Sequence, residues 1–209
     1  MSLPRRPFVL GSALLFASRD AHPAQDAGDL VGRVGRARAQ VRTLQGPFEQ
    51  TRTIGLMATD IHSRGTLVLV RPDRLRWALA PPDDVTFWVG PEGLGFKSAH
   101  GQGSVRTASA SLGAALEDLR TLLGGDLGKL RDRWDLRVVR DDASGAEIEA
   151  TPRAGQVVGL QRLRLSLGPD LARPTRALLV EGPRDHTLID FGALLVNAPV
   201  DEALMRPPA

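Results

Sequence analysis

The fold is decided by residues 65–97, which read GTLVLVRPDRLRWALAPPDDVTFWVGPEGLGFK. Large apolar side chains occupy every second position in parts of this stretch, as in Leu75, Trp77 and Leu79. A period of two is typical of β-strands that have one apolar and one solvated face. Turns that contain proline separate the apolar runs at intervals too short for a crossover helix. The stretch therefore predicts an antiparallel meander of strands.

The same pattern of short strands separated by turns extends over most of the chain. About eleven strands are expected, over residues 48–56, 61–71, 74–80, 84–90, 93–98, 103–108, 134–141, 146–152, 158–167, 173–182 and 185–196. Apolar residues recur with helical spacing over 26–45 and 111–123, and a short helical turn is expected over 126–132. So few helices cannot cover both faces of that much sheet, so the sheet must curve and cover itself as a barrel or half-barrel. The predicted fold class is mainly β with helices (α+β).

Length and composition exclude several classes of protein. The 209 residues fit one domain, and 42% apolar and 24% charged residues are typical of a globular chain. The absence of cysteine excludes disulfides, thiolate metal sites, a cysteine nucleophile and a lipid-modified cysteine. The four histidines lack metal-ligand spacing, and no Walker, dinucleotide-binding or G-x-S-x-G motif occurs. We expect no enzyme activity, no cofactor and no metal; a hydrolase would require a convergent acid/base pair.

The N-terminus has the layout of an export signal. Arg5 and Arg6 precede an apolar stretch over residues 8–17, and small and polar residues follow. A charged segment before a short apolar one is typical of secretory signals, and the alternative is a frayed terminal helix. We expect a signal peptide over 1–24, a single domain over 25–209 and a periplasmic location. The arginine pair leaves the general and the twin-arginine export routes open.

The apolar strand faces allow two interpretations. They either fill a core or line a cavity that takes an apolar ligand. An apolar void beneath residues 111–131 would favour the cavity, and solid packing there would favour the core. The helix predicted over 26–45 also allows two interpretations. Its arginines could face a membrane or nucleic acid, or they could simply face water. These arginines do not form one stripe, which favours a helix packed on the sheet with a solvated back.

The region 46–97 resembles the outer-membrane lipoprotein carrier protein family (LolA). Members of that family carry F-x-Q in one strand, then G-x-L-x-L-x-R-P, and then a strand that contains tryptophan. The matching residues are Phe48, Gln50, Gly65, Leu67, Leu69, Arg71, Pro72 and Trp77. The helical break between two blocks of strands and the Pro-Pro ending are similar too. The resemblance covers most of the chain after residue 24.

This resemblance implies an incomplete antiparallel β-barrel closed by an N-terminal helix and an internal lid helix. It implies a monomer whose hydrophobic cavity carries the acyl chains of lipoproteins from an inner-membrane release complex to an outer-membrane acceptor. The cargo-binding residues it implies are Phe48, Leu67, Leu69, Arg71, Leu75, Trp77, Phe87, Leu112, Leu116 and Leu119. The alternatives are a lipid-binding envelope sensor or assembly module of the same fold with another lipid cargo, and a structural module with a filled core.

One residue receives a specific role by resemblance. Arg71 is expected inside the barrel, where it donates hydrogen bonds to backbone carbonyls of the lid, residues 111–124. A buried guanidinium requires such acceptors. We expect these bonds to stabilise the closed, empty form, so that cargo loading breaks them. The alternative is an exposed arginine at a strand end.

Overall fold

The computed structural model describes residues 27–57, 59–105, 111–124, 127–155 and 159–208, and the predicted signal over 1–24 lies outside them. The helices are α1 (Ala27–Arg38), α2 (Ser111–Leu123), α3 (Leu127–Leu130) and the 3-10 helix η1 (Glu202–Met205). The strands are β1 (Thr43–Ile54), β2 (Thr59–Val70), β3 (Arg74–Leu79), β4 (Val85–Gly90), β5 (Gly93–Ser98), β6 (Gly101–Val105), β7 (Trp134–Asp142), β8 (Gly145–Pro152), β9 (Arg162–Leu167), β10 (Pro174–Val180), β11 (His186–Phe191) and β12 (Leu195–Val196). Within this part of the chain, no helix is both long and apolar enough to cross a membrane.

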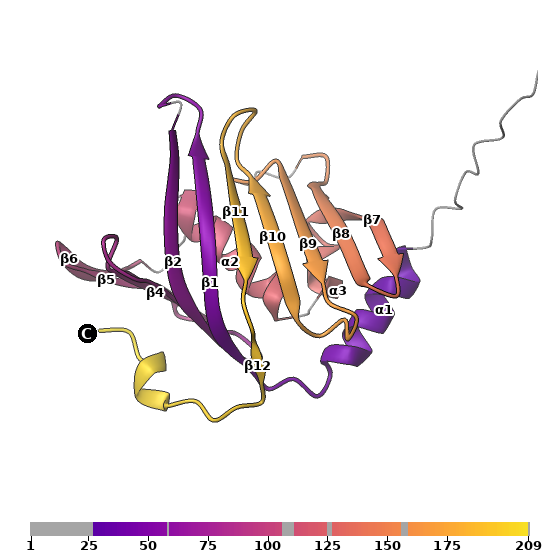
Figure 1. Ribbon diagram of the computed structural model, residues 1–209, viewed down its shortest axis with the longest axis horizontal. Coiled ribbons are helices and arrows are strands. Elements are labelled where there is room, and N and C mark those ends of the chain that lie inside the picture. The colour runs from indigo at the N-terminus through magenta and orange to yellow at the C-terminus, as the bar shows by residue number, and fades with distance from the viewer. Residues whose placement is uncertain (1–26, 58, 106–110, 125–126, 156–158, 209) are drawn as a thin grey trace, which may run out of the picture.

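The strands of the described residues belong to one antiparallel sheet. Their order is β6-β5-β4-β3-β2-β1-β11-β10-β9-β8-β7, with β12 paired to β1. The sheet curves without closing, because β6 and β7 lie at its two ends (Figure 1). The predicted fold class is therefore confirmed. The sheet has twelve strands rather than about eleven because the segment predicted as one strand over 185–196 forms both β11 and β12.

The N-terminal helix is shorter than predicted. It ends at Arg38, and β1 already begins at Thr43, so the prediction of helix as far as residue 45 is wrong. Leu44 and Phe48 are buried on the inner face, with Gly46 between them, which is the spacing of a strand. A Cβ at Gly46 would lie 2.8 Å from the carbonyl oxygen of Ala193, so glycine allows the backbone between β11 and β12 to approach β1 closely. Pairing with β2 and β12 outweighed the local helical pattern.

The inner face of the sheet and the helices α1, α2 and α3 form the core. In Figure 1, α2 and α3 lie behind the sheet, and α1 packs near β7 and α3. Phe48 of β1 stacks on Trp77 of β3 with the ring centroids 3.7 Å apart. Phe191 meets Trp77 edge-on at 6.4 Å. A Cβ at Gly65 would lie 2.1 Å from the carbonyl oxygen of Ala78, so only glycine fits beside Phe48.

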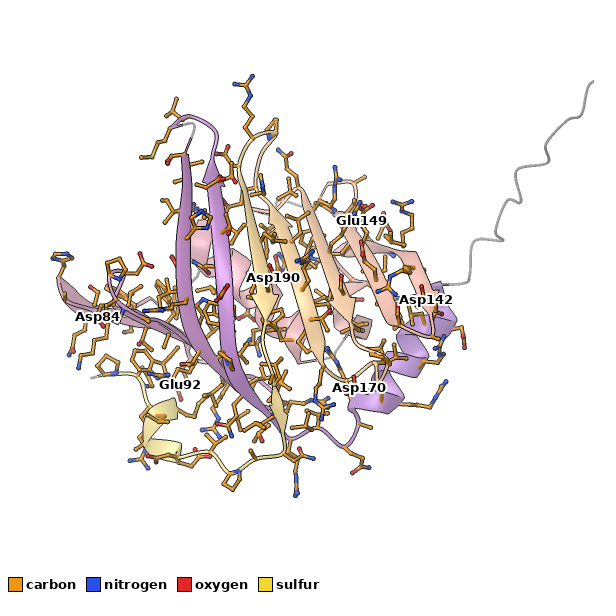
Figure 2. The ribbon with its side chains drawn as sticks, in the orientation of Figure 1. Asp84, Glu92, Asp142, Glu149, Asp170 and Asp190 are labelled. Carbon is orange, nitrogen blue, oxygen red and sulfur yellow. The ribbon has the colours of Figure 1, made fainter. Side chains whose placement is uncertain are left out.

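The outer face of the sheet is charged. Glu149 of β8, labelled in Figure 2, lies opposite Arg137 of β7 and Arg164 of β9. It forms ion pairs of 2.8 and 2.7 Å with these two arginines. The hydrogen bond from Arg137 lowers the pKa of Glu149. Arg176 and Asp190 make a similar pair at 2.6 Å across β10 and β11. The apolar chemistry of the molecule is therefore gathered on the inner face, beneath α2.

Candidate functional site

A cavity of about 250 Å³ lies between α2 and the inner face of the sheet. Most of its wall is apolar, and four polar residues complete it. The wall consists of Gln50, Arg52, Trp77, Leu79, Val85, Phe87, Leu116, Leu119, Leu179, Glu181, Thr187 and Ile189. Cavities with mostly apolar walls and a few convergent polar groups are typical ligand sites.

Cross-strand register builds the wall from the sheet side. Trp77 of β3 lies directly opposite Phe87 of β4, and Leu79 lies opposite Val85, so these four side chains point to the same face. Across the cavity, β10 and β11 place Leu179 opposite Thr187. The alternation of each strand thus sends one continuous apolar set inward.

Helix α2 forms the opposite wall. Leu116 and Leu119 are three residues apart, which places both on one face of the helix. Both side chains are buried. The position of α2 therefore determines how much of the apolar sheet face is covered.

The polar residues lie at one end of the cavity. Arg52 near the end of β1 forms an ion pair of 3.4 Å with Glu181, which follows β10. Both side chains are partly exposed. This end of the cavity is near the β1–β2 and β10–β11 turns, where the backbone N–H of Gly55 donates a 3.0 Å hydrogen bond to Asp185. Because both side chains of this ion pair reach solvent, we take this end as the mouth of the cavity.

A buried arginine holds the C-terminal end of α2. Arg38, the last residue of α1, is only 2% exposed. Its Nη1 donates hydrogen bonds to the carbonyls of Leu122 at 2.8 Å and Leu123 at 3.1 Å. The last carbonyls of a helix lack partners within the helix, and a cation is favourable there. Burial, together with the nearby charge of Arg71, lowers the pKa of Arg38 to about 10.

Arg71 holds the segment that carries Arg38. Its Nη1 donates to the backbone carbonyls of Arg38 and, at 3.3 Å, of Val41. The prediction that Arg71 bonds the carbonyls of the lid is therefore wrong in its acceptor. Within the described residues, the carbonyls of Leu122 and Leu123 in α2 accept hydrogen bonds from Arg38, and Arg71 donates to the carbonyls of the α1–β1 connection.

Two further contacts fix α2. Nη1 of Arg120 donates a 3.0 Å hydrogen bond to the carbonyl of Asp73 in the β2–β3 turn. We call Arg38, Arg71 and Arg120 the arginine clasp. On α2, the carboxylate of Asp118 is 1% exposed and pairs with Arg133 at 3.1 Å. Burial raises the pKa of Asp118 above its ordinary value.

The structure separates the predicted cargo-binding residues into groups. Trp77, Phe87, Leu116 and Leu119 line the cavity. Leu67, Leu69 and Leu75 are buried in the packed core and do not line it. Phe48 stacks on Trp77 and is not part of the cavity wall. The side chain of Leu112 lies outside the described residues.

Several wall residues were missed by the sequence analysis. They are Gln50, Arg52, Leu79, Val85, Leu179, Glu181, Thr187 and Ile189. The period of two in β10 and β11 is a signal that could have found Leu179 and Ile189, because both lie on buried positions of alternating strands. No signal marks Glu181, which follows the end of β10.

The fold is shared with several solved structures. A DUF1329 family protein from Desulfovibrio piger aligns with a TM-score of 0.53 at 11% identity, over 85% of this chain and 95% of its own. An uncharacterised conserved protein from Thermus thermophilus aligns with a TM-score of 0.52 at 9% identity, over 88% and 95%. MucB aligns with a TM-score of 0.51 at 18% identity, over 90% of this chain and 64% of its own. At these identities the likeness shows the fold alone.

The sequence itself gives the family. No curated protein matches the chain. Residues 39–207 match the family model described as outer membrane lipoprotein carrier protein LolA. This match includes β1 to β12, α2 and η1. The chain therefore belongs to the LolA family of outer membrane lipoprotein carrier proteins.

Proposed function

We propose that this protein is a periplasmic carrier that binds the acyl chains of lipoproteins and moves them from the inner to the outer membrane. The observation that carries the proposal is the apolar cavity under α2, a helix held by the arginine clasp. Members of the LolA family are carrier or binding proteins of the cell envelope rather than enzymes. The proposed partners are an inner-membrane release complex as donor and an outer-membrane acceptor, and the proposed state is a monomer.

We take this conformation as the closed one because its cavity is small. A water-sized group occupies about 30 Å³. The volume of about 250 Å³ thus takes on the order of eight methylene groups by that measure. Several acyl chains do not fit, so loading requires α2 to move away from the sheet.

The energy of loading favours the carrier interpretation. Each methylene removed from water contributes about 0.8 kcal/mol, so eight contribute about 6 kcal/mol. A cargo that also displaces α2 gains the apolar face beneath Leu116 and Leu119, and it loses the clasp. An occupant shifts the conformation only by its differential affinity for the open form. A closed form with its own favourable contacts therefore assists release.

The second candidate is a lipid-binding envelope module of the same fold. The small closed cavity favours it in one respect, because about eight methylene groups match one short chain better than the anchor of a lipoprotein. Such a module would bind a single-chain lipid without moving α2.

Native purification distinguishes these functions. The protein is purified without detergent from the envelope of its source, and the bound material is identified by mass spectrometry. A matched variant, Leu119→Asp, places a carboxylate in the cavity wall and serves as the control for specific binding. Acylated peptides that are lost from the variant support the carrier. Free lipid alone supports the module, and material equal in both proteins refutes a ligand in this cavity.

A further inference from the structure

The β1–β2 turn carries two exposed apolar side chains. Leu56 is 97% exposed and Met57 62% exposed. Neighbouring large apolar residues are rarely left so exposed on a soluble surface without a partner. In Figure 1 this hairpin projects beside the β10–β11 hairpin at one edge of the molecule.

The turn is held in place rather than loosely attached. Its backbone closes with a 3.0 Å hydrogen bond from the N–H of Met57 to the carbonyl of Ile54. The N–H of Gly55 donates to Asp185 of the β10–β11 turn at 3.0 Å. A Cβ at Gly55 would lie 2.2 Å from Cβ of Arg184, so glycine is required for the two turns to pack. Leu56 and Met57 are therefore presented by a turn that hydrogen bonds and packing hold in place.

The turn is adjacent to the mouth of the cavity. Arg52, at the polar end of the cavity wall, is four residues before Leu56 in the same hairpin. Glu181, its ion-pair partner, is four residues before Asp185, which holds the turn. A surface that receives Leu56 and Met57 therefore also faces the mouth.

We infer that this turn inserts Leu56 and Met57 into a lipid membrane and so places the mouth of the cavity at the lipid surface. The inference rests on the proposed function, because it gives acyl chains a path that avoids water. Two side chains on a convex turn bury far less than the roughly 1,000 Å² of a specific protein interface. A lipid surface needs no complementary shape.

The chemistry of the turn fits weak and reversible insertion. Full burial of a large apolar side chain is worth roughly 10- to 100-fold in partitioning. The nearby charges have both signs: Arg184 lies close to Asp185, and Asp60 accepts a 2.6 Å hydrogen bond from Thr53. Binding therefore depends on the apolar side chains and changes little with salt or anionic lipid.

The test uses the full chain and vesicles of phosphatidylcholine. The double variant Leu56→Ser/Met57→Ser is compared with the wild type, and Leu195→Ser/Leu204→Ser is the matched control, since Leu195 and Leu204 are exposed elsewhere. We expect at least about a tenfold loss of vesicle binding for Leu56→Ser/Met57→Ser, which we call the tip variant, and no loss for the control. Transfer of a fluorescent fatty acid from the loaded protein to vesicles should slow by a similar factor.

The outcomes separate this inference from the proposed function. If the wild type fails to take up the fluorescent fatty acid, the proposed function fails, whatever the vesicles show. If uptake is normal in all three proteins and the tip variant binds vesicles like the wild type, the inference is overturned. A defect that appears only with vesicles carrying an envelope acceptor protein would also overturn it, because the turn would then dock on protein.

Discussion

Replacement of Arg38 by methionine should release α2 from its closed position. Methionine keeps the length and apolar bulk of the side chain and removes the donor to the carbonyls of Leu122 and Leu123. Each buried carbonyl left without a partner costs about 1–3 kcal/mol. The two together cost about 2–6 kcal/mol, and the variant gains back the desolvation that a buried guanidinium suffers. We expect a net shift of about 2 kcal/mol, or about 30-fold, towards the open form.

Hydrogen exchange of the backbone amides measures that shift directly. Amides of α2 should exchange about 30-fold faster in the Arg38→Met protein, whereas those of the central strands β1 and β2 should not change, because local opening does not involve the whole sheet. Arg36→Met is the matched control, since Arg36 lies on the same helix and is exposed. Exchange in α2 that stays within about threefold of the wild type would refute the role of Arg38 in holding the helix.

The clasp, the cavity wall and the buried carboxylate of α2 can each be tested separately. Arg71→Leu removes the bonds that hold the α1–β1 connection, so the variant should retain a loaded fatty acid longer and transfer it more slowly in a transfer assay; equal rates would contradict this role. Thr187→Trp should displace about four methylene-sized groups from the cavity, weakening fatty-acid binding by about 3 kcal/mol, or about 100-fold, in a titration. The pKa of Asp118 is raised in the folded protein, so its contribution to the free energy of unfolding should fall as pH rises above about 4. Asp118→Asn should remove this fall from a plot of the free energy of unfolding against pH, and an unchanged plot would exclude Asp118 as its source.

The strands could be predicted because each has one buried face. In β3, Leu75 and Trp77 are buried and the arginines beside them are not, so apolar and charged residues alternate in the sequence with a period of two. The end of α1 was harder to place. Val41 and Leu44 fit both a helix and the start of a strand, and only the pairing of β1 with β2 and β12 decides between them.

The cavity wall could be predicted only in part. Leu67 and Trp77 share one face of the sheet, yet only Trp77 lines the cavity. The difference depends on where α2 lies over the sheet, which is set by tertiary contacts such as that between Arg120 and the carbonyl of Asp73. Sequence periodicity gives the face of a strand and does not give what covers it.

Arg38 was missed because it is one of several arginines in the same helix. Its function depends on acceptors 84 and 85 residues away in the sequence. One signal was present: Arg38 is four residues after Val34 and eight after Leu30, on the buried stripe of α1. A charged residue on an apolar stripe indicates a buried polar partner, and here the partner is the end of α2.

The choice of arginine makes the closed state only moderately stable, which suits a carrier. Arg38 loses hydration on burial, and its Nε and Nη2 find no hydrogen-bond partner within the described residues, so part of the energy of its two bonds is cancelled. The remainder is about 2 kcal/mol, the shift expected for Arg38→Met, which is about what the burial of two to three additional methylene groups contributes. A fully bonded clasp would keep cargo out, and an apolar contact in its place would leave the helix carbonyls unpaired. Because so small an energy holds the helix, a modest change in the surroundings of an acyl chain, such as contact of the cavity mouth with lipid, is sufficient to reverse the direction of transfer.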